Sequence, residues 1–191
     1  MPARADFAGT GATPRLVAPP AMRHIALLGN PNTGKTTLFN RLCGARAKTS
    51  NFPGTTTNVR YGRLVADGGA VAAEVIDLPG LYELHLDVPE SRLCRDVLAG
   101  VGPYRPPDTV IVVIDACNLT RNLVLAGEIL ASGLPTILVL NMVDLAQRRG
   151  LTLDAAALSD ATGCPVIPVI YAWLFTISAL CVAGSSCDIY W

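Results

Sequence analysis

The segment Gly29–Thr36 has the residue types and spacing that bind phosphate groups. It reads G-N-P-N-T-G-K-T, which fits the pattern G-x-x-x-x-G-K-[ST], and it lies between an apolar run and a predicted helix. Gly29 and Gly34 let the backbone turn so that N–H groups point inward, where the positive end of the helix also attracts phosphate oxygens. Lys35 is predicted to reach the β- and γ-phosphates, and Thr36 to be a ligand of Mg²⁺. The predicted nucleotide-binding residues of this loop are Gly29, Asn30, Pro31, Asn32, Thr33, Gly34, Lys35, Thr36 and Thr37.

A second motif, N-x-x-D, could select the base. Asn141 and Asp144 follow a predicted strand that ends at Leu140, at the carboxyl edge where ligands bind in open α/β sheets. The Asp144 carboxylate can accept hydrogen bonds from guanine N1–H and the 2-amino group, which adenine lacks, while Asn141 can contact the guanine edge and brace the phosphate loop. Met142, at the position of the usual lysine, could lie along the purine face. The alternative interpretation is a strand-end asparagine and a helix-capping aspartate.

A third motif, D-x-x-G, extends from Asp77 to Gly80. Asp77 is predicted to hold Mg²⁺ through a water molecule, and the Gly80 N–H to contact the γ-phosphate. The next residue is Leu81, where many GTPases have a glutamine that orients the attacking water, so intrinsic hydrolysis is predicted to be slow. Asn32 is a candidate ligand for a monovalent cation that bridges the phosphates. The alternative is that Asn32 only forms a turn.

The segment Asn51–Thr57 reads N-F-P-G-T-T-T and lies where a mobile switch would be expected. Thr56 is our candidate to close over Mg²⁺ and the γ-phosphate, although Thr55 and Thr57 have the same chemistry. A Pro-Gly turn that enters a Thr-rich strand is compatible with this role. The predicted catalytic residues are Lys35, Thr56, Gly80 and Asn32, and the predicted metal ligands are Thr36, Thr56 and Asp77.

The elements that must position these motifs alternate between strand and helix, which predicts a doubly wound α/β fold. Apolar runs without polar alternation predict parallel strands that are covered on both faces. Asp67-Gly68-Gly69 predicts a hairpin between two further strands, and Thr120 and Thr152 are predicted to cap the last two helices. The predicted strands are His24–Leu28, Val59–Ala66, Ala70–Ile76, Thr109–Asp115, Pro135–Leu140 and Pro165–Ile170, and the predicted helices are Lys35–Leu42, Pro89–Leu98, Arg121–Ala131 and Leu153–Ala161.

Composition excludes several classes of protein. The 191 residues are 51% hydrophobic and 16% charged, which excludes a disordered chain or a coiled coil. Fifteen basic and fifteen acidic residues balance, so no electrostatic footprint for nucleic acid is expected. The six cysteines and two histidines lack the spacing of zinc ligands, and we expect no iron site in this chain.

These motifs together resemble the N-terminal GTPase domain of FeoB-type ferrous iron transporters. The resemblance covers about residues 23–168 and is most specific in N-F-P-G and in D-L-P-G-L-Y, which is followed by Pro-Glu and Arg-Asp. It implies a P-loop NTPase of the small GTPase-like type with three layers. Its six-stranded sheet would be mostly parallel, with one antiparallel hairpin strand. It also implies that Thr56 is the metal-sensing threonine.

The function implied is a GTP-binding and GTP-hydrolysing switch that regulates Fe²⁺ uptake. The implied cofactors are GTP or GDP, Mg²⁺, and K⁺, for which Asn32 is the matching asparagine. The implied partner is a membrane permease domain at the cytoplasmic face of the inner membrane; the chain alone would be cytoplasmic or membrane-associated, and oligomer formation is left open. The alternatives are a soluble GTPase of RNA or ribosome assembly and a nucleotide-binding module without turnover.

Three regions are expected along the chain. Residues 1–22 would form a flexible leader, 23–170 the GTP-binding domain, and 171–191 an atypical apolar tail. The tail departs from the family after Val169, where a guanine-contacting loop is expected. A buried helix, a short membrane-inserting segment and a premature or frame-altered end are the candidate explanations, and we favour the last.

Overall fold

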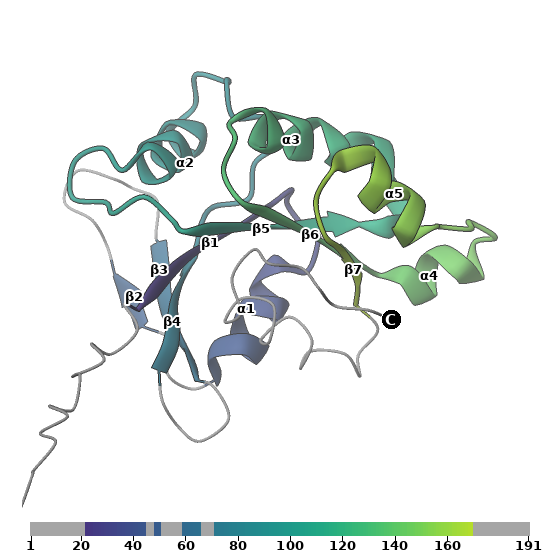
Figure 1. The fold of residues 1–191 in the computed structure, drawn as a ribbon, viewed down its shortest axis with the longest axis horizontal. Coiled ribbons are helices and arrows are strands. Elements are labelled where there is room, and N and C mark those ends of the chain that lie inside the picture. The colour runs from purple at the N-terminus through teal and green to yellow at the C-terminus, as the bar shows by residue number, and fades with distance from the viewer. Residues whose placement is uncertain (1–21, 45–47, 51–58, 66–70, 170–191) are drawn as a thin grey trace, which may run out of the picture.

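The computed structural model describes residues 22–44, 48–50, 59–65 and 71–169. These residues form a seven-stranded sheet in the order β2-β3-β4-β1-β5-β6-β7 (Figure 1). The strands are β1 (Arg23–Gly29), β2 (Lys48–Ser50), β3 (Val59–Val65), β4 (Val71–Asp77), β5 (Thr109–Asp115), β6 (Thr136–Asn141) and β7 (Val166–Pro168).

Helices cover both faces of the sheet, which gives the predicted three layers. Figure 1 shows α2, α3 and α5 on one side and α1 on the other. The α1 side buries Leu38 and Phe39 against Ile25 and Val75, while the opposite side buries Leu93 of α2 among other apolar side chains. The helices are α1 (Lys35–Cys43), α2 (Pro89–Ala99), α3 (Leu119–Ala131), α4 (Val143–Arg148) and α5 (Ala155–Thr162), with a 3₁₀ turn η2 at Ala116–Asn118.

The pairing pattern confirms the mixed sheet. β4, β1, β5, β6 and β7 are parallel to one another. β3 is antiparallel to β4, as the predicted hairpin requires, and the three-residue β2 adds a seventh, antiparallel strand beyond it. The carboxyl ends of parallel strands lie along one edge of the sheet. The ends of β1, β4 and β6 therefore bring Gly29, Asp77 and Asn141 to this same edge.

The predicted helix caps are wrong. α3 begins at Leu119 after Asn118, because η2 leads directly into it, so Thr120 lies inside the helix. α5 begins at Ala155, and Asp154 caps it by accepting a hydrogen bond from the Ala157 amide at 3.0 Å.

Several predictions concern parts of the chain that lie outside the described residues. These are the leader, the Asp67-Gly68-Gly69 turn, the segment with Thr55, Thr56 and Thr57, and residues 170–191. Within the described ranges, no helix combines the length and apolar character that a membrane crossing requires.

Candidate functional site

The phosphate loop connects β1 to α1 through two glycines. Gly34 precedes α1 in the left-handed conformation, with φ 84°, and a Cβ at this position would meet the Asn141 side-chain amide. A Cβ on Gly29 would lie 2.6 Å from the Val113 carbonyl oxygen. Because neither position has room for a side chain, the loop needs glycine at both.

Asn141 braces this loop, as its position in N-x-x-D predicts. Its Nδ2 donates a hydrogen bond to the Thr33 carbonyl at 2.8 Å, across a sequence separation of 108 residues. Thr33 is buried, and its hydroxyl donates to the Asn30 carbonyl at 3.0 Å. The candidate base-selecting motif and the candidate phosphate loop are therefore one hydrogen-bonded unit.

Lys35 and Asp77 form a buried ion pair at the start of α1 and the end of β4. Lys35 Nζ donates to Asp77 Oδ1, and the two residues are 8% and 5% exposed. Each charge needs the other, because an unpaired buried charge costs several kcal/mol. An ammonium group has three donors, so one bond to Asp77 leaves two for other acceptors. Sequence reasoning placed both residues in the site but did not anticipate their direct contact.

The D-x-x-G motif packs directly on the phosphate loop. The Leu78 amide donates to the Leu27 carbonyl at 3.1 Å, and the Leu81 amide donates to the Gly29 carbonyl at 3.3 Å. A Cβ on Gly80 would lie 3.2 Å from the backbone of Pro31. Leu81 itself is 4% exposed and belongs to the core on the α2 and α3 side. Its aliphatic side chain has no polar atom and can take no part in proton transfer.

The two loop asparagines differ in environment. Asn32 is exposed and left-handed, with φ 66°, a geometry consistent with the turn-forming alternative. Asn30 is 3% exposed, and both polar atoms of its side chain lack a hydrogen-bond partner among the described residues. An unsatisfied buried amide costs roughly 1–3 kcal/mol, so Asn30 marks a place where a polar group would be accommodated.

A cavity of about 330 Å³ lies beside the loop, between α1 and α4. Asp144 borders it from the first turn of α4, with 46% of its side chain exposed, and Arg148 lies 4.0 Å from its carboxylate. Met142 also lines the cavity and adopts the left-handed conformation with φ 61°. The other lining residues are Gly34, Thr37, Leu38, Arg41, Val113, Val139, Asn141, Leu145 and Val169.

Sequence reasoning missed part of this cavity. Leu38 and Arg41 of α1 are four and seven residues after Gly34, a spacing that places all three on one side of the chain as it enters the helix. This spacing could have identified Leu38 and Arg41 from the sequence.

The two threonines predicted as metal ligands differ in what the structure describes. Thr36 lies exposed in the first turn of α1, next to Lys35 of the Lys35–Asp77 pair, whereas the predicted ligand Thr56 lies outside the described residues.

Two thiols near the ion pair are poor nucleophiles. Burial, together with the nearby Asp77 carboxylate, raises the pKa of the Cys43 thiol to about 11. Burial also raises the pKa of Cys94 to about 12. Both thiols are therefore neutral near pH 7.

Among the residues that the structure describes, no three or more His, Cys, Asp or Glu side chains form a group that could hold a metal ion.

Comparisons with known proteins agree on one family. The family model described as "Ferrous iron transport protein B" matches residues 23–181. The Fe(2+) transporters FeoB of Salmonella typhimurium (strain LT2) and Escherichia coli (strain K12) are each 40% identical over 151 residues, which cover 76% of this chain and 19% of the relative. The chain therefore spans about a fifth of the length of these curated relatives.

Solved structures give the same result. A GDP-bound variant of the S. thermophilus FeoB G-domain is 36% identical, with a TM-score of 0.71 over 78% of this chain and 54% of that one. The cytosolic domain of L. pneumophila FeoB is 36% identical, with a TM-score of 0.71 over 83% of this chain and 65% of that one. The T. maritima FeoB G domain is 34% identical, with a TM-score of 0.68 over 78% of this chain and 87% of that one.

Proposed function

The chain belongs to the ferrous iron transport protein B family, and on this premise we propose that residues 23–170 bind guanine nucleotide, hydrolyse GTP and act as the switch of a ferrous iron transporter. The observation that carries the proposal is the hydrogen bond from Asn141 Nδ2 to the Thr33 carbonyl. It joins the candidate phosphate loop to the end of β6, three residues before Asp144, so that one nucleotide could reach from the loop to this candidate base-selecting carboxylate. A similar G-domain has been solved with GDP bound, which supports this choice of ligand.

The nucleotide would lie along the carboxyl edge of the sheet. Its phosphates would accept hydrogen bonds from the loop amides and from Lys35, whose ammonium has donors beyond the one used by Asp77. Its base would enter the cavity bordered by Met142 and Asp144. Adenine would leave the Asp144 carboxylate without donors, which is the physical basis for guanine selectivity.

The residues present fit a magnesium ion. The Thr36 hydroxyl, in the first turn of α1, would be a hard oxygen ligand, and the Asp77 carboxylate, at the end of β4, would hold the ion through a water molecule. Thr56 would be a further protein ligand. Bound there, Mg²⁺ would neutralise charge on the phosphate oxygens. The residues of this chain would then hold the triphosphate. Gly80, which lies beside Pro31, would contact the γ-phosphate.

Hydrolysis is proposed to be slow and to depend on potassium. The buried Leu81 supplies no group that could orient water, so charge in the transition state must be stabilised by other groups. Asn32, exposed at the tip of the loop, is the residue that would hold K⁺. Asn30, whose buried side-chain amide has no hydrogen-bond partner among the described residues, would add a second polar side chain on the same loop.

The role in iron uptake is proposed from the relatives, which are Fe(2+) transporters of which this chain covers 19%. A membrane permease would be the partner, with the switch at the cytoplasmic face of the membrane. The comparisons do not favour a GTPase of RNA or ribosome assembly.

Multiple-turnover phosphate release from GTP tests this function. We expect a slow rate in KCl that falls when NaCl replaces it. A rate in KCl that ATP supports equally would contradict guanine selectivity. Tight GTP binding without turnover in either salt would instead identify a nucleotide-binding module, which is the alternative that the buried Leu81 favours.

A further inference from the structure

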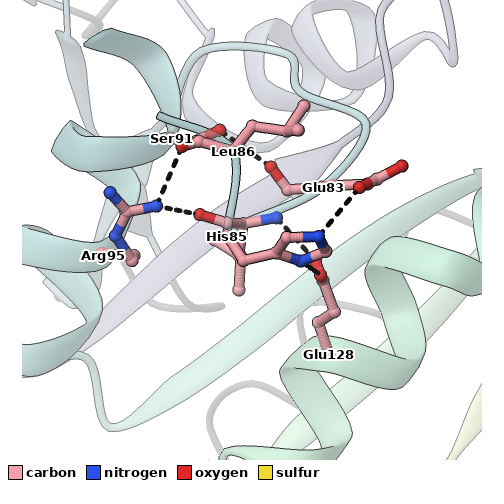
Figure 2. A network of polar contacts seen from close by, with 7 residues as sticks. Glu83, His85, Leu86, Ser91, Arg95 and Glu128 are labelled. Carbon is pink, nitrogen blue, oxygen red and sulfur yellow. Dashed lines mark hydrogen bonds and ion pairs between the residues drawn. The ribbon is translucent and has the colours of Figure 1, made fainter. Parts of the chain in front are cut away.

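Residues 82–88 connect Gly80 and Leu81 to α2, and α2 holds this 82–88 segment at three points. The Ser91 hydroxyl donates to the Glu83 carbonyl at 2.8 Å. The Arg95 guanidinium donates to the carbonyls of Leu84 and Leu86, the second at 3.1 Å. Figure 2 shows these contacts on one side of the segment.

α3 holds the same segment from the other side. Glu128 Oε2 accepts a hydrogen bond from the Leu84 amide at 2.6 Å, and Glu128 Oε1 contacts His85 Nδ1. Arg121 lies two turns earlier on the same face of α3, with its guanidinium 3.9 Å from the centre of the Tyr82 ring. α3 therefore contacts the segment through one cation and one carboxylate.

Both ring nitrogens of His85 face carboxylate oxygens. Nδ1 faces Glu128, and Nε2 lies 3.1 Å from Glu83 Oε2 (Figure 2). An ionised carboxylate only accepts hydrogen bonds, and a neutral imidazole has a single N–H. Both contacts are thus hydrogen bonds only when the ring carries two protons. The neighbouring cations Arg95 and Arg121 are directed at backbone carbonyls and at the Tyr82 ring instead.

We propose that Glu128 is a positioning residue that holds the 82–88 segment on α3 through the Leu84 amide and the doubly protonated His85 ring, so that this hold weakens as His85 loses a proton. The side chains suit this role, because Glu128 is 21% exposed and fixed on a helix, while His85 is 71% exposed and can exchange protons with solvent. Histidine is the side chain that changes charge between about pH 5 and 8.

The significance of this hold rests on the proposed function. The segment begins two residues after Gly80, the residue proposed to contact the γ-phosphate, and the amide of Leu81 between them donates a hydrogen bond to the Gly29 carbonyl. Glu128 would therefore set how freely the chain beyond Gly80 can move when the nucleotide changes.

Amide exchange of Leu84, measured by NMR on the full ¹⁵N-labelled chain without nucleotide, tests the proposal. After correction for the intrinsic exchange rate, we expect about fivefold greater protection at about pH 5.5 than at about pH 8. The reason is that the contact between His85 and Glu128 is stronger when the imidazole ring is charged, and this contact holds Glu128 against the Leu84 amide. Glu128→Gln and His85→Gln should each abolish this pH dependence. Glu74→Gln is the matched control, because Glu74 pairs with the other histidine, His24, at 3.3 Å, and it should behave as the wild type.

Two results would overturn the proposal: equal protection of Leu84 at both pH values in the wild type, or a pH dependence that persists in Glu128→Gln. His85→Gln changes an exposed side chain and keeps the test available if Glu128→Gln fails to fold. Since no nucleotide is present, a failure of the proposed GTPase function would leave this measurement unaffected.

Discussion

Asp144 borders the cavity from the first turn of α4 and is the residue proposed to choose the base. We predict that Asp144→Asn lowers GDP affinity by about 10–100-fold and raises affinity for xanthosine diphosphate, because the asparagine amide can donate to the 2-oxo group of xanthine. Asp160→Asn removes the same charge from an exposed position on α5 and should change neither affinity. Competition binding with both nucleotides measures the ratio, and an unchanged ratio in Asp144→Asn would remove this residue from the site.

Lys35 is proposed to bind phosphate and is paired with Asp77, and a single variant removes both interactions. We predict that Lys35→Ala weakens GTP binding by at least about a hundredfold, through the loss of charge-assisted hydrogen bonds to phosphate. It should also lower the free energy of unfolding by about 3–5 kcal/mol, because Asp77 is left as an unpaired buried charge. Urea unfolding gives the second quantity. Arg105→Ala, which breaks an exposed pair with Asp108, should cost less than about 1 kcal/mol, and an equal cost would refute the argument from burial.

At this scale the sequence predicted the motifs but not all of their contacts. The glycines of the phosphate loop and the brace from Asn141 follow from residue type and from the shared carboxyl edge of parallel strands. The Lys35–Asp77 pair does not, since two residues predicted to meet a nucleotide and a metal are also complementary to each other. The burial of the Asn30 amide has no signal in a motif that leaves its second position free.

The short elements show where sequence patterns stop being informative. α4 has six residues and β2 has three, too few for a helical or a strand period to emerge from the sequence. The long apolar strands were predicted within a few residues because burial on both faces leaves a continuous signal. The cap of α5 was misassigned because Thr152 and Asp154 are both good capping types, and local chemistry alone does not choose between them.

The cap of α5 offers a test at the scale of an element. Asp154→Ala should lower the free energy of unfolding by about 1 kcal/mol, because the Ala157 amide loses its acceptor. Thr152→Ala should lie within about 0.5 kcal/mol of the wild type. Chemical denaturation of both variants decides between them, and a larger loss for Thr152→Ala would show that the helix begins earlier than in this structure.

The whole molecule should become less stable in alkali. Burial raises the pKa of Cys43 to about 11 and those of Cys94 and Tyr61 to about 12. The folded state thus keeps protons that the unfolded chain releases from about pH 9 upward, and stability present at neutral pH is lost as the pH rises toward these values. Each such group contributes a slope of up to about 1.4 kcal/mol per pH unit.

Denaturant unfolding under reducing conditions between about pH 7.5 and 10.5 measures this slope. Cys94→Ala should show a shallower decline than the wild type, because one of the buried titrating groups is gone, even though its stability at pH 7.5 is lower. A free energy of unfolding that stays constant over the whole range would contradict the burial of these thiols.

The proposed function requires one continuous surface, on which the loop amides and Lys35 would hold the phosphates while Asp144 would select guanine. Calorimetric titration of the folded chain with GDP and ADP, each with magnesium, tests it most directly. The account predicts saturable binding of GDP with one site per chain and an affinity at least about a hundredfold weaker for ADP. Equal affinity for the two nucleotides, or no heat of binding with either from a chain shown to be folded, would contradict it.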